Sequence, residues 1–375
     1  MKRTRILLIV LALVSLVGLF TTRVQRKMPD FEVYYTAAAR AYAAQPLYRA
    51  EDGHFQFKYL PAFAVIASPM ALLPLSAAKA AWFGGSAVLM LVLLWLSLRA
   101  LPAVHRPPAL LIAGTFVAMA KFYAHELVLG QVNLLFGVLA ALAIVWLKRG
   151  RDAEAGVLLA LAVVVKPYGA IFAPWLAAGR RTTAFASMLS VLVLLLLLPA
   201  VSYGWTGNLR LVASWWQTVS TTTAPNVMNP DNVSLGSLFA KYLGQGTTST
   251  LLAALAALAL LALTGVVIAG RGRIGTPETL EGSLLLLLIP LLSPQGWDYV
   301  LLISTPAVML LLDNLDSLPR GLRYAAAAAL AIVAFAIYDL IGRDAYAAFM
   351  QLSIVTICAV IEAAALVALR FRRVA

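Results

Sequence analysis

The stretch Leu251-Leu-Ala-Ala-Leu-Ala-Ala-Leu-Ala-Leu-Leu-Ala-Leu-Thr-Gly-Val-Val-Ile-Ala269 contains no charged residue, and it decides the class of fold. A bilayer core is about 30 Å thick and is crossed by roughly 20 apolar residues in an α-helix. A second such run extends from Ile6 to Phe20, and the whole chain is 62% hydrophobic and only 12% charged. Because the runs are unbroken rather than alternating, a membrane β-barrel is excluded. The sequence therefore predicts an all-α polytopic membrane protein.

Positive charge is placed in short clusters between the apolar runs. The net charge is +13, but clusters of this kind mark the cytoplasmic side of a membrane, so they indicate topology and argue against DNA or RNA binding. The first cluster, Lys2, Arg3 and Arg5, precedes the first apolar run, and Arg23 rather than a cleavage site follows it. We expect an uncleaved first span. Because the chain has only one cysteine, Cys358, a disulfide framework is excluded. We expect Cys358 to be a small core residue.

Lys and Arg concentrate in the short loops on the cytoplasmic side of a membrane protein. If the first basic cluster is cytoplasmic, the later clusters fit a chain of about 12 membrane segments with both termini in the cytoplasm. The expected segments are approximately residues 6–22, 80–98, 108–123, 131–147, 154–165, 168–178, 183–200, 249–269, 279–292, 300–312, 324–341 and 349–369. The pair 154–165 and 168–178 is too short to cross unaided. We expect it to enter and return, with its Lys166-Pro-Tyr-Gly169 joint near the outer face.

The loops differ in length between the two sides. The cytoplasmic turns have only a few residues, whereas two outer loops, at about 23–79 and 201–248, are long and carry most of the acids and aromatics outside the spans. No soluble domain or internal repeat is visible. We expect a single transmembrane domain over residues 1–375, with these two loops forming its catalytic face.

The first outer loop contains Met28-Pro-Asp-Phe-Glu-Val-Tyr-Tyr35, in which Asp30 and Glu32 are the only acids before Glu51. Apolar and aromatic residues at three- and four-residue spacing predict a short amphipathic helix at the membrane interface. Asp30 is either the N-cap of that helix or a general base whose partly desolvated carboxylate takes a proton from a sugar hydroxyl. Glu32 points to another face and is the weaker candidate, while Tyr34 and Tyr35 follow directly.

Polar residues also lie at the ends of the central segments. Lys166 ends an apolar run before a proline, where it either holds a phosphate or extends its amine to the interface. His125 and Glu126 precede Gln131 and Asn133 at the start of the next segment, and they are either substrate contacts or the satisfied entrance of a helix. The three histidines of the chain are scattered, so no metal-ligand spacing is present.

The second outer loop and the segment after residue 292 add further candidates. Trp205, Trp215 and Trp216 are expected to form an aromatic belt at the interface, and they could also stack on sugar rings. Asn232 lies in a polar, turn-forming stretch of the same loop. Asp298 lies at the outer end of a span, where it is either a cap or a substrate contact.

Taken together, these residues resemble glycosyltransferase family 87, the bacterial polyprenyl-phosphate-mannose-dependent mannosyltransferases. The resemblance runs through most of the chain and rests on order and spacing. Its motifs are Asp30-Phe-x-x-Tyr-Tyr-x-Ala-Ala, Pro46-Leu-Tyr48, Tyr59-Leu-Pro-x-Phe, Pro69-x-x-x-Leu-Pro74, Gly130-Gln-Val-Asn133, Ala155-Gly with Lys166-Pro ten residues later, Asn232-Val-Ser-Leu and Ser293-Pro-x-x-Trp-Asp298.

The resemblance implies a GT-C glycosyltransferase fold and an inverting transfer of a hexose, with mannose as the expected sugar. The implied donor is a polyprenyl-phosphate-sugar, and the acceptor is a glycolipid or polysaccharide at the outer face of the bacterial cytoplasmic membrane. Asp30 matches the catalytic aspartate. The residues expected to contact substrates are Glu32, Tyr34, Tyr35, His125, Gln131, Asn133, Lys166, Asn232, Trp297, Asp298 and Tyr299. Membrane lipid is the other expected partner, and no cofactor or metal is implied.

One position departs from the family pattern. Members of the family often have a histidine shortly after the Trp-Asp pair, where this chain has Tyr299, which can donate a hydrogen bond but cannot supply charge. Two alternative functions remain. A transporter or lipid flippase would also have broken helices and an intramembrane lysine, and an inactive relative of the enzymes would retain the same motifs.

Overall fold

The computed structural model describes residues 14–273 and 276–371, and in these ranges it is helical, with no strand and a single isolated bridge between Asn232 and Trp297. Five helices are long and apolar enough to cross a membrane. These are α4 (Leu75–Ala100), α5 (Pro108–Leu129), α12 (Thr247–Ala269), the continuous segment Asp298–Ser317 and α18 (Ile354–Phe371). The prediction of an all-α membrane protein is confirmed, whereas the twelve-segment GT-C arrangement stays a prediction.

A sixth span is formed if two helices joined by a sharp bend are taken together. Helix α9 (Thr182–Leu197) meets α10 (Ala200–Thr223) at 93°. Two residues interrupt the helix near the bend: Pro199, which has no backbone N–H to donate to the preceding turn, and Gly204, whose backbone is non-helical (φ 69°, ψ 171°). The segment expected at 183–200 therefore ends at this proline, and the chain continues as a long helix in the second outer loop.

The shorter apolar segments also form helices. They are α6 (Asn133–Lys148), α7 (Asp152–Val165), α8 (Phe172–Ala178), α13 (Pro277–Leu292), α14 (Thr305–Asn314) and α15 (Arg320–Phe335). Helix α5 continues past the expected end at residue 123, so Lys121 and Glu126 are helical rather than part of a loop. The first expected span, 6–22, lies partly outside the described residues. Its described part is helical from residue 14 and ends in the π-helical turn Phe20–Val24.

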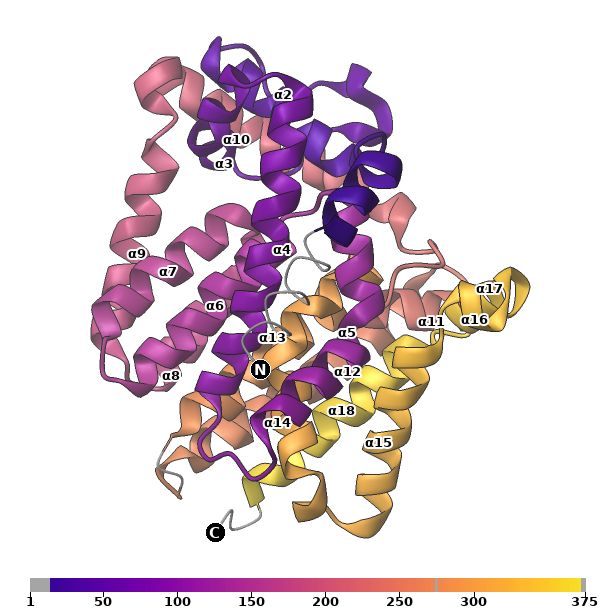
Figure 1. Ribbon diagram of the computed structural model, residues 1–375. Coiled ribbons are helices and arrows are strands. Elements are labelled where there is room, and N and C mark those ends of the chain that lie inside the picture. Colours follow the sequence, from indigo (N-terminus) through magenta and orange to yellow (C-terminus); the bar gives the residue numbers. More distant parts are fainter. Residues whose placement is uncertain (1–13, 274–275, 372–375) are drawn as a thin grey trace.

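The two loops predicted to lie on the outer side are largely helical. The first forms α2 (Pro29–Tyr42), the 3₁₀ turns Ala50–Phe55 and Ser68–Leu72, and α3 (Pro61–Ala67). In Figure 1, α2 and α3 lie beside α10 of the second loop at the top of the molecule, above α6, α7 and α9. The second loop ends with α11 (Leu235–Leu243), which lies near α16 (Tyr338–Ile341) and α17 (Arg343–Gln351) at the right of the view.

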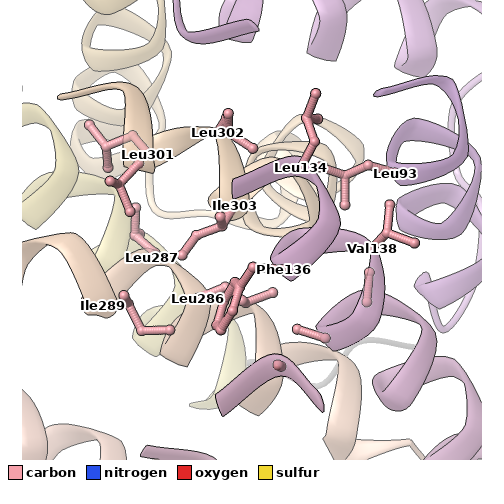
Figure 2. Close-up of a cluster of buried hydrophobic side chains, with 14 of the residues drawn as sticks. Leu93, Leu134, Phe136, Val138, Leu286, Leu287, Ile289, Leu301, Leu302 and Ile303 are labelled. Atoms are coloured by element: carbon pink, nitrogen blue, oxygen red, sulfur yellow. The ribbon is translucent and has the colours of Figure 1, made fainter. Parts of the chain in front are cut away.

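The core is built where α4, α6, α13 and the 3₁₀ turn Asp298–Ser304 meet. Figure 2 shows Leu93, Phe136, Leu287 and Ile303 among the side chains that fill this region, and all four are fully buried. In a membrane, close van der Waals packing rather than the hydrophobic effect holds helices together, so small residues allow near approach. At Gly156 of α7, a Cβ would lie 2.3 Å from a carbonyl oxygen of α9.

At the opposite end from α2, a buried carboxylate ties three helices together. Glu281 of α13 accepts hydrogen bonds from Arg271 (2.7 Å), Arg370 of α18 (2.6 Å) and the indole of Trp175 in α8 (2.9 Å). This end carries the basic clusters predicted to be cytoplasmic. Because Glu281 has no exposed surface, these partners must replace water in stabilising its negative charge.

Candidate functional site

Helix α2 begins directly against the turn between α5 and α6. Its first residue is Pro29, and Met28 precedes it as the N-cap in the left-handed conformation (φ 64°). The backbone N–H of Met28 donates to a carbonyl oxygen near the end of α5 at 3.1 Å. The approach requires Gly130, since a Cβ on that residue would lie 2.7 Å from the Cβ of Phe31. The orientation of α2 is thus fixed by the turn that carries Gln131.

Of the two alternatives for Asp30, helix N-cap and general base, the first is wrong. Pro29 occupies the first helical position, which suits its fixed φ and its missing N–H. Asp30 is therefore the second residue of α2, and no side chain caps the helix. The half-buried carboxylate of Asp30 is therefore not engaged in capping and can contact other groups.

The environment of Asp30 combines burial with positive charge. Burial has the largest effect and raises the pKa of the carboxyl above its ordinary value. A hydrogen bond with the Gln131 side chain and the charges of Lys166, His54 and Lys58 each lower that pKa. A carboxylate in such a setting can accept a proton from a neighbouring hydroxyl.

Gln131 connects the groups that surround Asp30. Its Oε1 accepts hydrogen bonds from the hydroxyls of Tyr34 (2.8 Å) and Tyr59 (3.4 Å) and from Nζ of Lys166 (3.4 Å). Its Nε2 donates to the hydroxyl of Tyr299 at 3.3 Å. We call these five residues, together with Asp30, the Gln131 cluster. They come from α2, the turn before α3, the turn before α6, the joint after α7 and the start of the Asp298–Ser317 segment.

Lys166 is a buried cation with weak polar contacts. Its side chain is 8% exposed, so its amine does not extend to the solvent. Nζ lies 5.4 Å and 5.7 Å from the ring centroids of Tyr59 and Tyr168, and its hydrogen bond to Gln131 is long. An ammonium held in this way is costly, and it is suited to bind an anionic group that enters the site.

A second layer of hydrogen bonds supports the cluster. Glu126, fully buried at the end of α5, accepts hydrogen bonds from Nδ2 of Asn133 (2.8 Å) and the backbone N–H of Leu134 (2.9 Å). Oδ1 of Asn133 accepts from the hydroxyl of Tyr168 at 2.9 Å. Through its bond to Leu134, Glu126 satisfies a backbone N–H in the first turn of α6 that has no acceptor within the helix. Glu126 and Asn133 therefore form the entrance of α6 and fix the ring over which Lys166 lies.

His125 and Asp298 come together beside the cluster. Nδ1 of His125 lies 3.6 Å from Oδ2 of Asp298, and neither atom has another hydrogen-bond partner in the described part of the chain. Asp298 is 1% exposed, while the His125 side chain is 40% exposed. Trp297, which precedes Asp298, stacks on Tyr299 with the ring planes 10° apart. The pair therefore borders the Gln131 cluster through Tyr299.

Three of the other expected contacts have partners outside the cluster. Glu32 forms an ion pair with Lys79 of α4 at 2.5 Å. The hydroxyl of Tyr35 donates to the Leu73 carbonyl oxygen at 2.8 Å. Asn232 is fully buried, and its Nδ2 donates to the Pro294 carbonyl oxygen at 2.9 Å, so it joins the second outer loop to the segment before Asp298.

The tryptophans of the second outer loop differ in exposure. Trp205 and Trp216 of α10 are 67% and 65% exposed, and their place in an aromatic belt stays a prediction. Trp215 instead donates from its indole to the Lys58 carbonyl oxygen at 3.1 Å. It therefore fixes the chain next to Tyr59 of the Gln131 cluster.

A scan against protein families matches residues 57–294 to glycosyltransferase family 87. The chain belongs to glycosyltransferase family 87. Membership indicates a glycosyltransferase, and it confirms the resemblance seen in the sequence motifs. Neither the search of curated proteins nor the search of solved structures finds a match.

The range matched to family 87 contains Tyr59, Gln131 and Lys166, whereas Asp30 precedes it and Tyr299 follows it. The structure thus joins residues inside the match to residues outside it. Sequence reasoning missed Lys58 as a charge acting on Asp30, and it noted Tyr59 only as part of a motif. The signal available for both was the Phe57-Lys-Tyr-Leu-Pro61 stretch, where the first outer loop returns to an apolar environment.

In residues 14–273 and 276–371, no three His, Cys, Asp or Glu side chains come together in a way that could hold a metal ion. The single cysteine, Cys358, is buried in α18, in agreement with its expected place in the core.

Proposed function

We propose that this chain is an inverting hexosyltransferase. It moves a sugar, with mannose as the expected one, from a polyprenyl-phosphate donor to a glycolipid or glycan acceptor at the outer face of the bacterial cytoplasmic membrane. The observation that carries the proposal is the Gln131 cluster, in which Gln131 links a half-buried carboxylate, Asp30, to a buried cation, Lys166. The proposed base and the proposed phosphate-binding group thus share one hydrogen-bond partner, Gln131.

In the proposed reaction, Asp30 takes the proton of an acceptor hydroxyl while the hydroxyl oxygen attacks C1 of the donor sugar. The bond between C1 and the phosphate oxygen breaks, and the lipid phosphate leaves with the electron pair. Lys166 stabilises the negative charge that develops on this phosphate. Attack from the opposite face inverts C1, so a β-linked lipid donor gives an α-glycoside and free polyprenyl phosphate.

The tyrosines of the Gln131 cluster support the proposed reaction as neutral hydrogen-bond donors. Burial raises the pKa values of Tyr34 and Tyr59 well above the ordinary value. Their hydroxyls therefore stay protonated near neutral pH and act as hydrogen-bond donors. Tyr34 donates to Gln131 Oε1 at 2.8 Å. The Tyr59 hydroxyl lies 2.7 Å from that of Tyr34 and 3.4 Å from Oε1, so its one proton is donated to either of them. Nε2 of Gln131 is directed toward Tyr299 and is available to Asp30.

The experiment uses purified protein in liposomes with polyprenyl-phosphate-[14C]mannose on the outside and a panel of glycolipid acceptors. The expected result is a radiolabelled glycolipid with an α-linkage by NMR and no product from a nucleotide-linked sugar. Product from the nucleotide sugar alone would overturn the proposed donor. Movement of a labelled lipid or solute across the membrane without any transfer would overturn the enzyme assignment in favour of a transporter or flippase.

A further inference from the structure

A second group of charged side chains lies next to the Gln131 cluster, and the proposed reaction does not use it. Its centre is the carboxylate of Asp298, which is 1% exposed. Asp298 begins the 3₁₀ turn Asp298–Ser304, immediately after Trp297. Its backbone N–H donates to the Asp231 carbonyl oxygen at 3.0 Å. The main chain at this residue is therefore attached to the second outer loop.

Two side chains of α5 supply positive charge near this carboxylate. Lys121 is a cation, and His125 becomes one on protonation. The two residues are four positions apart, so they lie on the same face of the helix. Nδ1 of His125 lies 3.6 Å from Oδ2 of Asp298, and the charges of Asp298 and Asp231 act on Lys121. Because a buried carboxylate is costly without cationic partners, these side chains form one ionic group.

Lys121 has few other polar contacts. It is 8% exposed, and its amine donates one long hydrogen bond, of 3.5 Å, to the Ala336 carbonyl oxygen. Nζ lies 5.0 Å from the ring centroid of Phe122 and 5.7 Å from those of Tyr346 and Phe349 of α17. These rings keep water away from the amine, so solvent screens its charge only weakly. The charge is therefore available to the nearby carboxylate.

A similar pair at the opposite end of α5 shows the geometry of a closed contact. Nδ1 of His105 lies 3.0 Å from Oδ2 of Asp313, whose Oδ1 accepts from the backbone N–H groups of His105 and Arg106. Both oxygens of that carboxylate are therefore satisfied. In the described part of the chain, Oδ2 of Asp298 and Nδ1 of His125 are buried and have no hydrogen-bond partner. The contact between them is thus ionic rather than a closed hydrogen bond.

The ionic group is connected to the Gln131 cluster through the next residue, Tyr299. The Tyr299 ring stacks on that of Trp297, with centroids 6.5 Å apart, and its hydroxyl accepts a hydrogen bond from Nε2 of Gln131 at 3.3 Å. This bond fixes the direction of the Gln131 amide, because Nε2 can only donate and Oε1 can only accept. Oε1 is thereby directed toward Lys166. A displacement of Asp298 would move Tyr299 and release the amide.

We propose that His125 and Lys121 are positioning residues that act through Asp298. Their positive charge holds the Asp298 carboxylate in place. The adjoining Tyr299 then stays against Gln131 and directs Oε1 toward the proposed phosphate-binding lysine. The inference rests on the proposed transferase function, and it differs from the sequence-based expectation that His125 and Asp298 contact substrate.

A double-mutant cycle on kcat distinguishes positioning from substrate contact. Tyr299→Phe keeps the ring that stacks on Trp297 but removes the acceptor for Gln131. We expect Tyr299→Phe and His125→Ala each to lower kcat by about tenfold, the effect of roughly one hydrogen bond, with both KM values within about twofold of wild type. The double variant should be no slower than Tyr299→Phe. A loss of about a hundredfold in the double variant, or a raised KM in His125→Ala alone, would overturn the inference.

Three further variants control for charge and folding. His105→Ala removes the matched histidine and should leave kcat unchanged. His125→Lys restores a positive charge and should return kcat to within about threefold of wild type; a rate as low as that of His125→Ala would overturn the ionic role. Because the loss of one partner of a buried charge can unfold a protein, Asp298→Asn repeats the cycle without an unpaired carboxylate. It should lower kcat in the wild-type background and have no further effect beside Tyr299→Phe.

Fluorine NMR tests the positioning without any need for transfer. In protein labelled with 5-fluorotryptophan, the Trp297 resonance is the one that disappears in Trp297→Phe. We expect this resonance to move in His125→Ala and to keep its wild-type position in His105→Ala. In a protein that transfers no sugar, a moved resonance would support the positioning of this turn and reject the proposed function. An unmoved resonance would overturn the positioning role whatever the activity.

Discussion

Replacing Lys166 by methionine tests whether this buried cation serves function rather than stability. Methionine has nearly the same length and fills the same space without charge. The lost contacts are one hydrogen bond of 3.4 Å and two aromatic rings at 5.4 Å and 5.7 Å, all weak for a side chain that is 8% exposed. A buried ammonium is costly, but Lys166 also offsets the negative charges of buried Glu126 and of Asp30. Because these two effects oppose each other, we expect Lys166→Met to unfold within a few degrees of wild type.

The effect on activity should be large. Removal of one group that stabilises charge in a transition state typically lowers kcat by about 10²–10³-fold, or roughly 3–4 kcal/mol. The substitution also removes a positive charge that lowers the pKa of Asp30. The acid limb of the rate profile should therefore move to higher pH, since the carboxylate must be ionised to act as a base.

A matched control is available in Lys148, which is half-buried at the other end of the molecule. Its Nζ donates to the carbonyl oxygens of Ala100 and Leu101 at 2.6 Å and 2.8 Å, so it satisfies the end of α4. Lys148→Met should lower the apparent Tm by several degrees, because hydrogen bonds from a charged group contribute about 1.5–3 kcal/mol. Its transfer rate per folded molecule should equal that of wild type.

The assay for both variants is initial transfer rate with saturating polyprenyl-phosphate-mannose, alongside thermal unfolding in the same detergent. If Lys166→Met retained its rate within threefold of wild type, the assignment of Lys166 to the donor phosphate would be refuted. If it lost activity only in proportion to a lowered Tm, the lysine would have a structural role.

Two further changes test the environment of Asp30 and the ion network at the far end. Lys58→Gln removes a charge that lowers the pKa of Asp30, so the acid limb of kcat/KM should shift to higher pH; no shift, or a shift to lower pH, would contradict this electrostatic picture. Glu281→Leu leaves the buried guanidinium of Arg370 and the partly buried one of Arg271 without their carboxylate and should destabilise the protein by about 3–5 kcal/mol. Thermal inactivation measures that loss, and an unchanged Tm would show that the network contributes nothing.

The helices of this protein were largely predictable because apolar runs and basic clusters are local signals. The exceptions have local causes as well. Helices α9 and α10 meet at 93°, where Pro199 lies between them and Gly204 interrupts the start of α10, a bend that hydropathy alone cannot show. The capping alternative for Asp30 failed by two positions, since Pro29 occupies the first position of the helix and Met28 is the N-cap.

The grouping of the site residues was not predictable in the same way. Gln131 and Asn133 looked equivalent in sequence, yet Gln131 lies before the first turn of α6 and faces Lys166, while Asn133 lies within that turn and binds Glu126. Tyr59 joins the cluster through contacts between separate parts of the chain, which periodicity does not encode. Family motifs pointed to most of these positions, but only the fold shows which of them share hydrogen bonds.

The most direct test of the central claim is the transfer rate of Asp30→Asn under saturating donor and acceptor. Asparagine keeps the shape of the side chain but cannot take a proton. If Asp30 is the base, the rate should fall by about 10²–10⁴-fold while the Tm and donor binding stay at wild-type values. A variant that transfers sugar as fast as wild type would contradict the assignment of Asp30, and with it the proposed mechanism.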